Sequence, residues 1–240
     1  MNDVRLQKFF TDCGILSRRA AEAEIRAGRV LVNGKVAEIG QKIDPSLDQV
    51  EYNGKPVTYT PAPQKHYILL NKPRGFVTTL SDEKGRATVA ELVAQVGCRV
   101  YPVGRLDMDS DGLLLLTDDG ELTNRLTHPR HEIPKHYTVA VKGEVTRAQL
   151  ARLNESFVLD DYATLPAKVE CIGCEGNATL LTFRLFEGRN RQIRRMCEEV
   201  GLSITRLTRT AIGHITLGDL PIGQYRSLSE KEIAYLKGEQ

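Results

Sequence analysis

The sequence lacks three features: a strong net charge, a regular set of cysteines and a long apolar run. Its 33 basic and 31 acidic side chains leave a net charge of only +2, while 41% of its 240 residues are hydrophobic. This composition excludes a disordered tail, because such a chain buries too little apolar surface to offset the entropy of ordering. The five cysteines are odd in number and scattered, which excludes a disulfide framework and predicts reduced thiols in a cytoplasmic protein.

The apolar runs are also too short for a membrane protein. The purest of them, residues 67–70 and 113–116, fall far short of the roughly 20 residues that a membrane helix needs. The first residues, Met1–Arg5, mix acid and base and carry no apolar stretch of a signal peptide. We therefore expect no membrane partner.

The small net charge argues at first against a nucleic-acid partner, because proteins that grip phosphates usually carry a basic excess. The charges are, however, segregated along the chain. Residues 1–35 hold seven basic and four acidic side chains, and residues 183–210 hold seven arginines and three glutamates. Residues 106–124 hold six acids and no base. The sequence therefore has two basic segments that could hold RNA, and an acidic segment between them.

Residues 1–60 predict a small α/β module. Four apolar residues at helical spacing predict a first helix with one buried face: Leu6, Phe9, Phe10 and Cys13. Ser17 is a favourable N-cap for a second helix over residues 18–26. The dipeptides Asn33-Gly34 and Asn53-Gly54 each predict a tight hairpin turn.

A proline-containing stretch predicts a linker at residues 61–65, and residues 66–240 predict a second, larger domain. Strand-like runs lie at residues 67–70, 137–141, 167–171 and 178–185. Helix-like runs lie at residues 88–96, 120–126, 147–153 and 191–200. Because strands and helices do not alternate regularly, we expect an α+β domain with a mixed, mainly antiparallel sheet rather than a doubly wound fold.

The acidic segment allows two interpretations. The first is a calcium loop, because Asp107, Asp109 and Asp111 have EF-hand spacing, although residues 99–103 before them are not helical in character. The second is that one of these carboxylates is a nucleophile, which a nearby cation keeps ionised. The concentrated supply of cations is a run of four arginines directly after Gly188: Arg189, Arg191, Arg194 and Arg195.

Several separated motifs, found in order along the chain, resemble the RsuA/RluB family of pseudouridine synthases. They are Leu70-Asn71-Lys72-Pro73-Arg74-Gly75, Gly104-Arg105-Leu106-Asp107 with residues 110–120, Lys135-x-Tyr137-x-Val139, and residues 188–196. The N-terminal module resembles the small RNA-binding domain first seen in a ribosomal small-subunit protein. The resemblance covers nearly the whole chain, and no matched position departs from the family pattern.

The resemblance implies isomerisation of a uridine to pseudouridine within ribosomal RNA, a reaction that requires neither cofactor nor metal. It implies that Asp107 is the nucleophile, that Arg194 pairs with it and that Tyr137 stacks on the extruded base. Three residues are expected to line the substrate pocket: Arg105, Leu106 and Ile193. Basic residues of the matched motifs and of the N-terminal module are expected to bind RNA: Arg18, Arg19, Arg26, Arg29, Lys72, Arg74, Arg189 and Arg191.

The sequence leaves the substrate less defined than the reaction. The form of the motif after Gly188 favours large-subunit ribosomal RNA, with small-subunit RNA as the alternative, and the RNA could be free or part of a ribosome assembly intermediate. We expect the protein to act as a monomer. Two other classes of function stay open: a non-catalytic ribosome-assembly factor that binds RNA through the same basic residues, and a calcium-binding protein.

Overall fold

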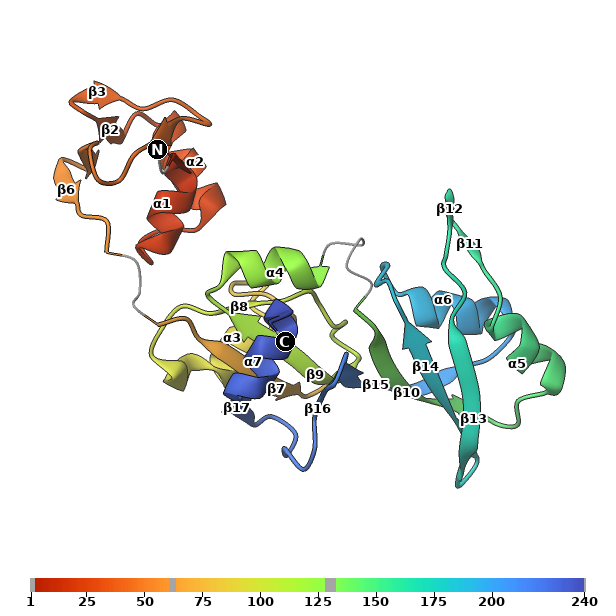
Figure 1. Ribbon diagram of the computed structural model, residues 1–240. Helices are drawn as coiled ribbons and strands as arrows, with labels where there is room; N and C mark the ends of the chain where they lie inside the picture. The colour runs from red at the N-terminus through yellow and green to blue at the C-terminus, as the bar shows by residue number, and fades with distance from the viewer. Residues whose placement is uncertain (1–2, 61–63, 128–132, 240) are drawn as a thin grey trace. The chain divides into compact units, whose positions relative to one another are not determined.

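A computed structural model describes residues 3–60, 64–127 and 133–239 (Figure 1). The chain divides into two compact units, residues 1–65 and 66–240. Of the predicted linker, residues 61–63 lie outside the described residues. Among the helices of the described part, none combines the length and apolar character needed to cross a membrane.

The first unit packs two helices against short strands. Its helices are α1 (Leu6–Asp12) and α2 (Arg18–Arg26). Its strands are β1 (Val4–Arg5), β2 (Val30–Val32), β3 (Lys35–Val36), β4 (Lys42–Ile43), β5 (Val50–Tyr52) and β6 (Lys55–Val57). Ser17 caps α2 by accepting a hydrogen bond from Ala20 N at 3.1 Å. The predicted second helix is therefore confirmed. Asn33 and Asn53 both have positive φ and connect paired antiparallel strands, so both predicted hairpin turns are confirmed as well.

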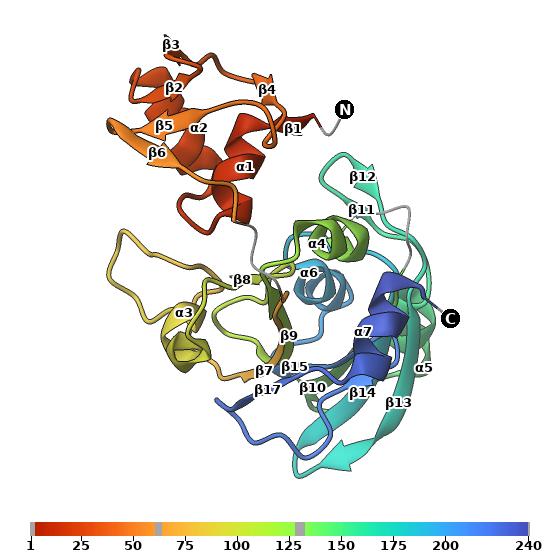
Figure 2. The same cartoon turned by 60° about the vertical axis from the view of Figure 1, so that its left-hand side comes forward.

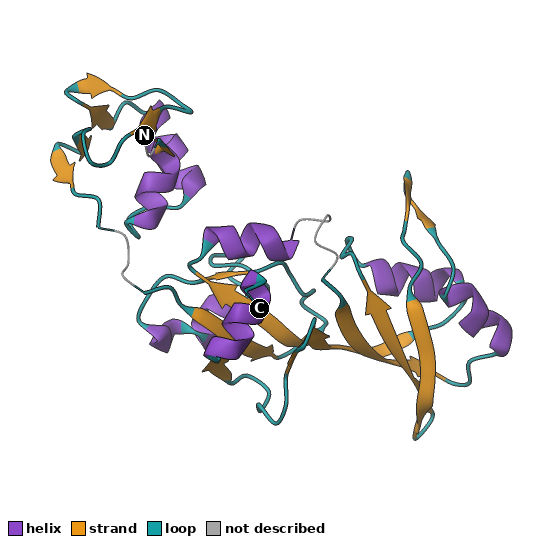
Figure 3. Ribbon diagram, in the orientation of Figure 1, coloured by secondary structure: helices purple, strands orange, loops and turns teal. Residues whose placement is uncertain are grey.

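The second unit is built on one large sheet (Figure 3). Its longer strands are β7 (Tyr67–Lys72), β9 (Asp111–Thr117), β10 (Lys135–Lys142), β13 (Lys168–Glu175), β14 (Ala178–Leu185) and β15 (Ile204–Ile212). Its shorter strands are β8 (Tyr101–Pro102), β11 (Val158–Leu159), β12 (Tyr162–Ala163), β16 (Ile215–Thr216) and β17 (Tyr225–Ser227). Its helices are α3 (Val89–Leu92), the 3-10 turn η1 (Ala94–Val96), α4 (Gly120–Thr127), α5 (Arg147–Leu153), α6 (Gln192–Glu199) and α7 (Glu230–Lys237).

The main path of the sheet runs β13-β14-β10-β15-β9-β7-β17, with β16 added to β15 and β8 added to β9. Every pairing in it is antiparallel except that of β15 with β9, which is parallel. The α+β class with a mixed, mainly antiparallel sheet is therefore confirmed. Figures 1 and 2 show α5 beside β13, and α3, α4 and α7 around the end of the sheet that contains β7 and β9.

Helices cover both faces of β7 and β9. Alternate residues of these strands enter two different apolar clusters: Leu70 and Leu114 join the cluster of α3, α5 and α6, whereas Leu69 and Leu113 join that of α4 and α7. A strand buried on both faces has no polar side and reads as a continuous apolar run. This explains the two purest apolar runs of the sequence.

The parallel seam between β9 and β15 depends on Gly112, which lies opposite Arg209. Gly112 has a φ of +107°, and a Cβ added there would lie 2.8 Å from Arg209 N and still closer to Arg209 O. Only glycine allows the two backbones to approach this closely, because any side chain would meet main-chain atoms that cannot move aside.

We therefore predict that Gly112→Ala lowers the free energy of unfolding by about 3 kcal/mol or more, since backbone strain and overpacking add. Gly201→Ala is the matched control, because Gly201 has a φ of +75° but no atom within 4 Å of an added Cβ. Strain alone should cost that variant about 1–2 kcal/mol. Urea unfolding of both variants tests the prediction, and equal losses would show that the seam tolerates a side chain.

Candidate active site

The loop that carries Asp107 connects β8 to β9 and is fastened by its backbone. Thr78 Oγ1 donates a hydrogen bond to Leu106 O at 2.6 Å and accepts one from Leu106 N at 3.3 Å. Gly75 N donates to Met108 O at 2.7 Å. The segment after β7 therefore holds the loop on both sides of Asp107.

Lys72, at the end of β7, is 0% exposed and lies beneath this loop. Its Nζ donates to three carbonyl oxygens: Asp107 O at 3.0 Å, Ser110 O at 2.9 Å and Pro73 O at 3.1 Å. Burial lowers the pKa of Lys72 to about 8, against the opposing effect of the nearby Asp111 and Asp107 charges. The prediction that Lys72 binds RNA is wrong, because a fully buried ammonium that uses all three N–H groups on the loop cannot reach a phosphate.

Two arginines at the start of α6 face the Asp107 carboxylate. Arg191 Nη1 lies 3.5 Å and Arg194 Nε lies 3.7 Å from Asp107 Oδ2. Arg194 is more tightly bound to the next turn of the loop, because its Nη2 lies 3.1 Å from Asp109 Oδ1 and donates to Ser110 Oγ at 3.0 Å. The structure thus brings Arg194 and Asp107 together as expected, and adds Arg191 as a second cation on the same oxygen.

Asp107 opens onto a cavity of about 210 Å³. Among its lining residues are three that the sequence predicted for the pocket and one predicted for base stacking: Arg105, Leu106, Ile193 and Tyr137. Tyr137 is 9% exposed and lies on β10, so most of its ring packs in the core next to Leu106 and Ile193. The lining of the cavity therefore combines apolar side chains with a carboxylate and several arginines.

The predicted RNA-binding arginines are on the surface. Arg18, Arg19, Arg26 and Arg29 are exposed on the first unit, and Arg74, Arg189 and Arg191 are exposed on the second. Arg29 is partly neutralised, because its Nε and Nη2 bind the Glu24 carboxylate at 2.6 and 2.8 Å. Arg189 lies at the cavity and stacks over the Tyr162 ring at 3.7 Å. Apart from Lys72, all of these side chains are accessible to a phosphate backbone.

The EF-hand interpretation is contradicted by where the three aspartates lie. Asp111 is 4% exposed, and its carboxylate is bound by Arg206 Nε at 3.2 Å and by the Thr208 hydroxyl. The carboxylates of Asp107 and Asp109 form ion pairs with Arg191 and Arg194 and do not converge on a common point with Asp111. A calcium loop needs converging, uncompensated oxygens between two helices, whereas Asp111 begins a strand.

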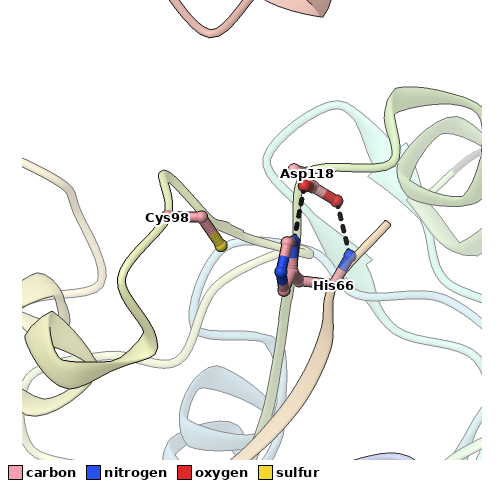
Figure 4. Close-up of side chains that lie close together, drawn as sticks. All are labelled: His66, Cys98 and Asp118. Carbon is pink, nitrogen blue, oxygen red and sulfur yellow. Dashed lines mark hydrogen bonds and ion pairs between the residues drawn. The ribbon is translucent and has the colours of Figure 1, made fainter. Parts of the chain in front are cut away.

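One other group of potential metal ligands occurs in the described part of the chain: His66, Cys98 and Asp118 (Figure 4). Asp118 uses both oxygens on His66, because Oδ1 accepts from His66 N at 2.8 Å and Oδ2 lies 2.9 Å from Nδ1. Burial, together with the Asp118 charge, raises the pKa of the Cys98 thiol and so disfavours the thiolate that a metal requires. We interpret the group as a hydrogen-bonded pair that holds the start of β7 against the end of β9.

Sequence reasoning missed two site residues that lie on strands, Lys135 on β10 and Arg209 on β15. Lys135 was noted only as part of a motif, and Arg209 was not singled out. The available signal was alternation: Lys135 precedes Tyr137 by two residues, and Arg209 follows Leu207 by two, so each shares a strand face with its apolar neighbour. These four strand residues all line the cavity: Lys135, Tyr137, Leu207 and Arg209.

Comparisons with known proteins give matches to both units of the chain. The family model described as RNA pseudouridylate synthase matches residues 66–199, and the S4 domain model matches residues 4–48. The chain is 44% identical to an uncharacterised RNA pseudouridine synthase of Aquifex aeolicus (strain VF5), covering 98% of this chain and 94% of that protein. It is 40% identical to ribosomal large subunit pseudouridine synthase B of Bacillus subtilis (strain 168), covering 97% and 95%. A crystal structure of a pseudouridylate synthase matches with a TM-score of 0.69 and 31% identity, covering 97% of this chain and 99% of that one.

The buried ammonium of Lys72 gives a pH-dependent prediction. Folding lowers the pKa of Lys72 from 10.5 to about 8, so between these values the unfolded chain keeps a proton that the folded chain has released. Stability therefore rises with pH in this window, by up to about 1.4 kcal/mol per pH unit from this group. We expect the unfolding free energy of the wild type, relative to that of Lys72→Met, to increase between pH 8 and pH 10.

Urea unfolding at pH 7.5 and 9.5 measures this difference. Tyrosines and other groups that titrate in the same range are common to both proteins and cancel. Lys142→Met, which removes an exposed lysine at the end of β10, is the matched control and should show no such increase. A constant difference between wild type and Lys72→Met at the two pH values would contradict the lowered pKa.

Proposed function

Because this chain belongs to the RNA pseudouridylate synthase family, in its RsuA/RluB branch, it is an RNA pseudouridine synthase, and we propose that it modifies large-subunit ribosomal RNA. The observation that carries the proposed mechanism is the Asp107 carboxylate, which faces two arginines at a cavity that Tyr137 also lines. The choice of subunit rests on relatives named ribosomal large subunit pseudouridine synthase B, from Bacillus subtilis and from Pseudomonas aeruginosa. Small-subunit RNA is the alternative.

In the proposed mechanism, an Asp107 oxygen attacks C1′ of the target uridine. The C1′–N1 bond breaks and its electron pair stays on the uracil ring. After the ring turns, C5 bonds to C1′ and the carboxylate leaves with the electrons of its ester bond. The proton on C5 is lost and N1 gains one, so the product is an isomer and no oxidant or reductant takes part.

The surrounding residues have separate tasks in this mechanism. Arg191 and Arg194 orient the carboxylate and balance its charge when it is displaced. Tyr137 stacks on the flipped base: extrusion costs a few kcal/mol, and stacking on an aromatic ring returns about 1–3 kcal/mol of it. Leu106 and Ile193, which belong to the same apolar cluster as Tyr137, exclude water from the pocket.

We also propose that residues 1–60 form an RNA-binding module and residues 61–65 its linker, with the catalytic domain at 66–240. Arg18, Arg19 and Arg26 are exposed on α2, and no carboxylate of the described residues lies within ion-pair distance of them. Such unpaired cations are suited to phosphates, because binding releases counterions from the RNA. The proposed substrate is ribosomal RNA, free or in an assembly intermediate, and the proposed active form is a monomer.

The nucleophile is tested by comparing Asp107 with Asp109, two carboxylates of one loop that face the same arginines. Asp107→Asn should lower single-turnover activity on ribosomal RNA fragments by about 10⁴-fold or more, because the covalent step is lost. Asp109→Asn is the matched control and should retain activity within about tenfold, because it changes only the interaction with the two arginines. Pseudouridine mapping by primer extension in a deletion strain, complemented with each form, identifies the target uridine and subunit.

Two results would contradict the proposal. An unchanged pseudouridine pattern in the deletion strain, together with inactive wild-type protein in vitro, would favour a non-catalytic assembly factor. Equal losses for Asp107→Asn and Asp109→Asn would remove the special role of Asp107.

The RNA-binding module is tested by salt dependence. Changing Arg18, Arg19 and Arg26 together to Gln should weaken RNA binding and reduce the slope of log affinity against log salt by roughly 1 for each phosphate that the module no longer neutralises. Arg29→Gln is the matched control, because Arg29 is already paired with Glu24, and it should change the slope less. Filter binding at three salt concentrations measures the slopes. If the triple variant has the same affinity and the same slope as the wild type, α2 does not hold RNA.

A further inference from the structure

Two cations at the inner end of the cavity are not used by the Asp107 loop. Lys135 and Tyr137 lie on the same face of β10, and Arg209 lies opposite Tyr137 on the adjacent strand β15. All three line the cavity, together with Leu207 and Leu185 from the same face of the sheet. The sheet therefore supplies a floor that is apolar except for one guanidinium, one ammonium and one phenol.

Arg209 is only 5% exposed, and its hydrogen bonds are incomplete. Its Nε donates to Leu113 O at 2.7 Å, which fixes the guanidinium against β9. Its Nη2 is buried and has no hydrogen-bond partner, and no carboxylate in the described part of the chain forms an ion pair with it. A buried charge without a partner is costly, so a ligand in the cavity that accepts a hydrogen bond from this guanidinium is favoured.

Lys135 is in a similar position. It is partly buried, and burial together with the positive charge of Arg209 lowers the pKa of its ammonium group. The residues that the structure describes give it no ion-pair partner. Two cations that repel each other at one end of a cavity are stabilised by a ligand that brings electron-rich oxygen or negative charge between them.

The depth of these groups shows which part of a nucleotide they can meet. Arg105, Arg189 and Arg191 at the cavity are exposed and accessible to phosphates. Arg209 is buried, and Tyr137 opposite it is 9% exposed. The floor is therefore suited to the flat base of a flipped nucleotide, and the outer arginines to its backbone.

We propose that Arg209 and Lys135 form a cationic floor that binds the carbonyl oxygens of uracil and stabilises the negative charge of the ring when it leaves the sugar. This inference rests on the proposed function, because it assumes that the uridine ring enters this cavity. When the C1′–N1 bond breaks, the electron pair is delocalised over N1 and the carbonyl oxygens. Donors placed at those oxygens interact more strongly with the anion than with the bound uridine, so they accelerate the step.

The same floor distinguishes uracil from cytosine. Arginine and protonated lysine offer only donors, whereas cytosine carries an amino donor in place of one uracil carbonyl. A cytosine in this position would leave a buried donor facing another donor, and such unpaired groups produce strong discrimination.

The test replaces the proposed acceptor atom instead of only the protein group. RNA substrates carry uridine, 2-thiouridine or 4-thiouridine at the target position, because sulfur is a much weaker acceptor than oxygen. At the carbonyl that Arg209 holds, sulfur should slow the wild-type single-turnover rate about tenfold. Arg209→Gln should be slowed about 100-fold on uridine but less than about twofold further by sulfur, because the interaction is already absent.

Lys135→Met should likewise lose the rate decrease that sulfur causes, in this case when sulfur replaces the other uracil carbonyl oxygen. The matched control is Arg184→Gln, since Arg184 lies next to Leu185 on β14 but on the opposite face of the strand; it should keep the wild-type response to sulfur. If Arg209→Gln fails to fold, as judged by thermal unfolding, Arg209→Lys is measured with the same substrates. Equal sulfur effects in wild type and in the Arg209 variant would overturn the proposal, because a merely structural role gives additive losses.

A binding measurement separates this inference from the proposed function. NMR titration with uridine 5′-monophosphate and cytidine 5′-monophosphate should show a preference for the uracil nucleotide in the wild type and none in Arg209→Gln. A uracil preference without turnover of any ribosomal RNA would overturn the proposed function and support the floor. Turnover of ribosomal RNA without any preference for the uracil nucleotide would support the proposed function and overturn the cationic floor.

Discussion

The ammonium group of Lys72 lies under the loop that carries Asp107 and donates to three carbonyl oxygens, two of them from the loop itself. Hydrogen bonds from a charged donor are worth about 1.5–3 kcal/mol each, and losing them would leave three carbonyls without their partner. The desolvation of the charge opposes this gain, which is why the pKa falls. The backbone of the nucleophile is thus held from below by β7, while its carboxylate is held from the side by α6. A reacting group must be placed to within a fraction of an ångström, and these two independent attachments supply that placement.

The same requirement explains the unusual centre of the sheet. Residues 104–111 and 189–209 are far apart in the sequence, and the parallel pairing of β9 with β15 brings them together. This pairing is possible only because Gly112 presents no side chain to Arg209. Because β9 is covered on both faces, the seam is also dry, and the hydrogen bond from Arg209 to Leu113 O closes it. The strand that positions the Asp107 loop therefore also positions the proposed base-binding arginine.

Much of this fold is predictable from the sequence, and the exceptions have physical causes. The helices of the first unit follow from helical spacing and an N-cap, and β10 and β14 follow from alternation. The strands β9 and β15 do not alternate clearly: Leu113–Leu116 is apolar throughout because both faces are buried, and β15 is rich in Arg and Thr. Asp107, Arg194 and Tyr137 could be named from the resemblance to a family. Lys72 was assigned the wrong partner, because a motif identifies a lysine but not whether its side chain points to solvent or into the core.

Burial also resolves the near-zero net charge of the chain. Side chains of the same charge lie in four different environments: Arg18 and Arg26 are exposed, Arg191 and Arg194 face carboxylates, Lys72 binds carbonyls, and Arg209 has a buried Nη2 without a partner. Composition counts them equally, although only the exposed ones attract a phosphate at long range. The described cavity lining has one acid, Asp107, which faces Arg191 and Arg194, and the ion pairs of the described residues include neither Arg209 nor Lys135. Burying an unpaired positive charge is costly, and a ligand that supplies electron density lowers that cost. In the proposed mechanism the uracil ring becomes an anion when the C1′–N1 bond breaks, so these two cations interact with it most strongly at that step and favour the reaction.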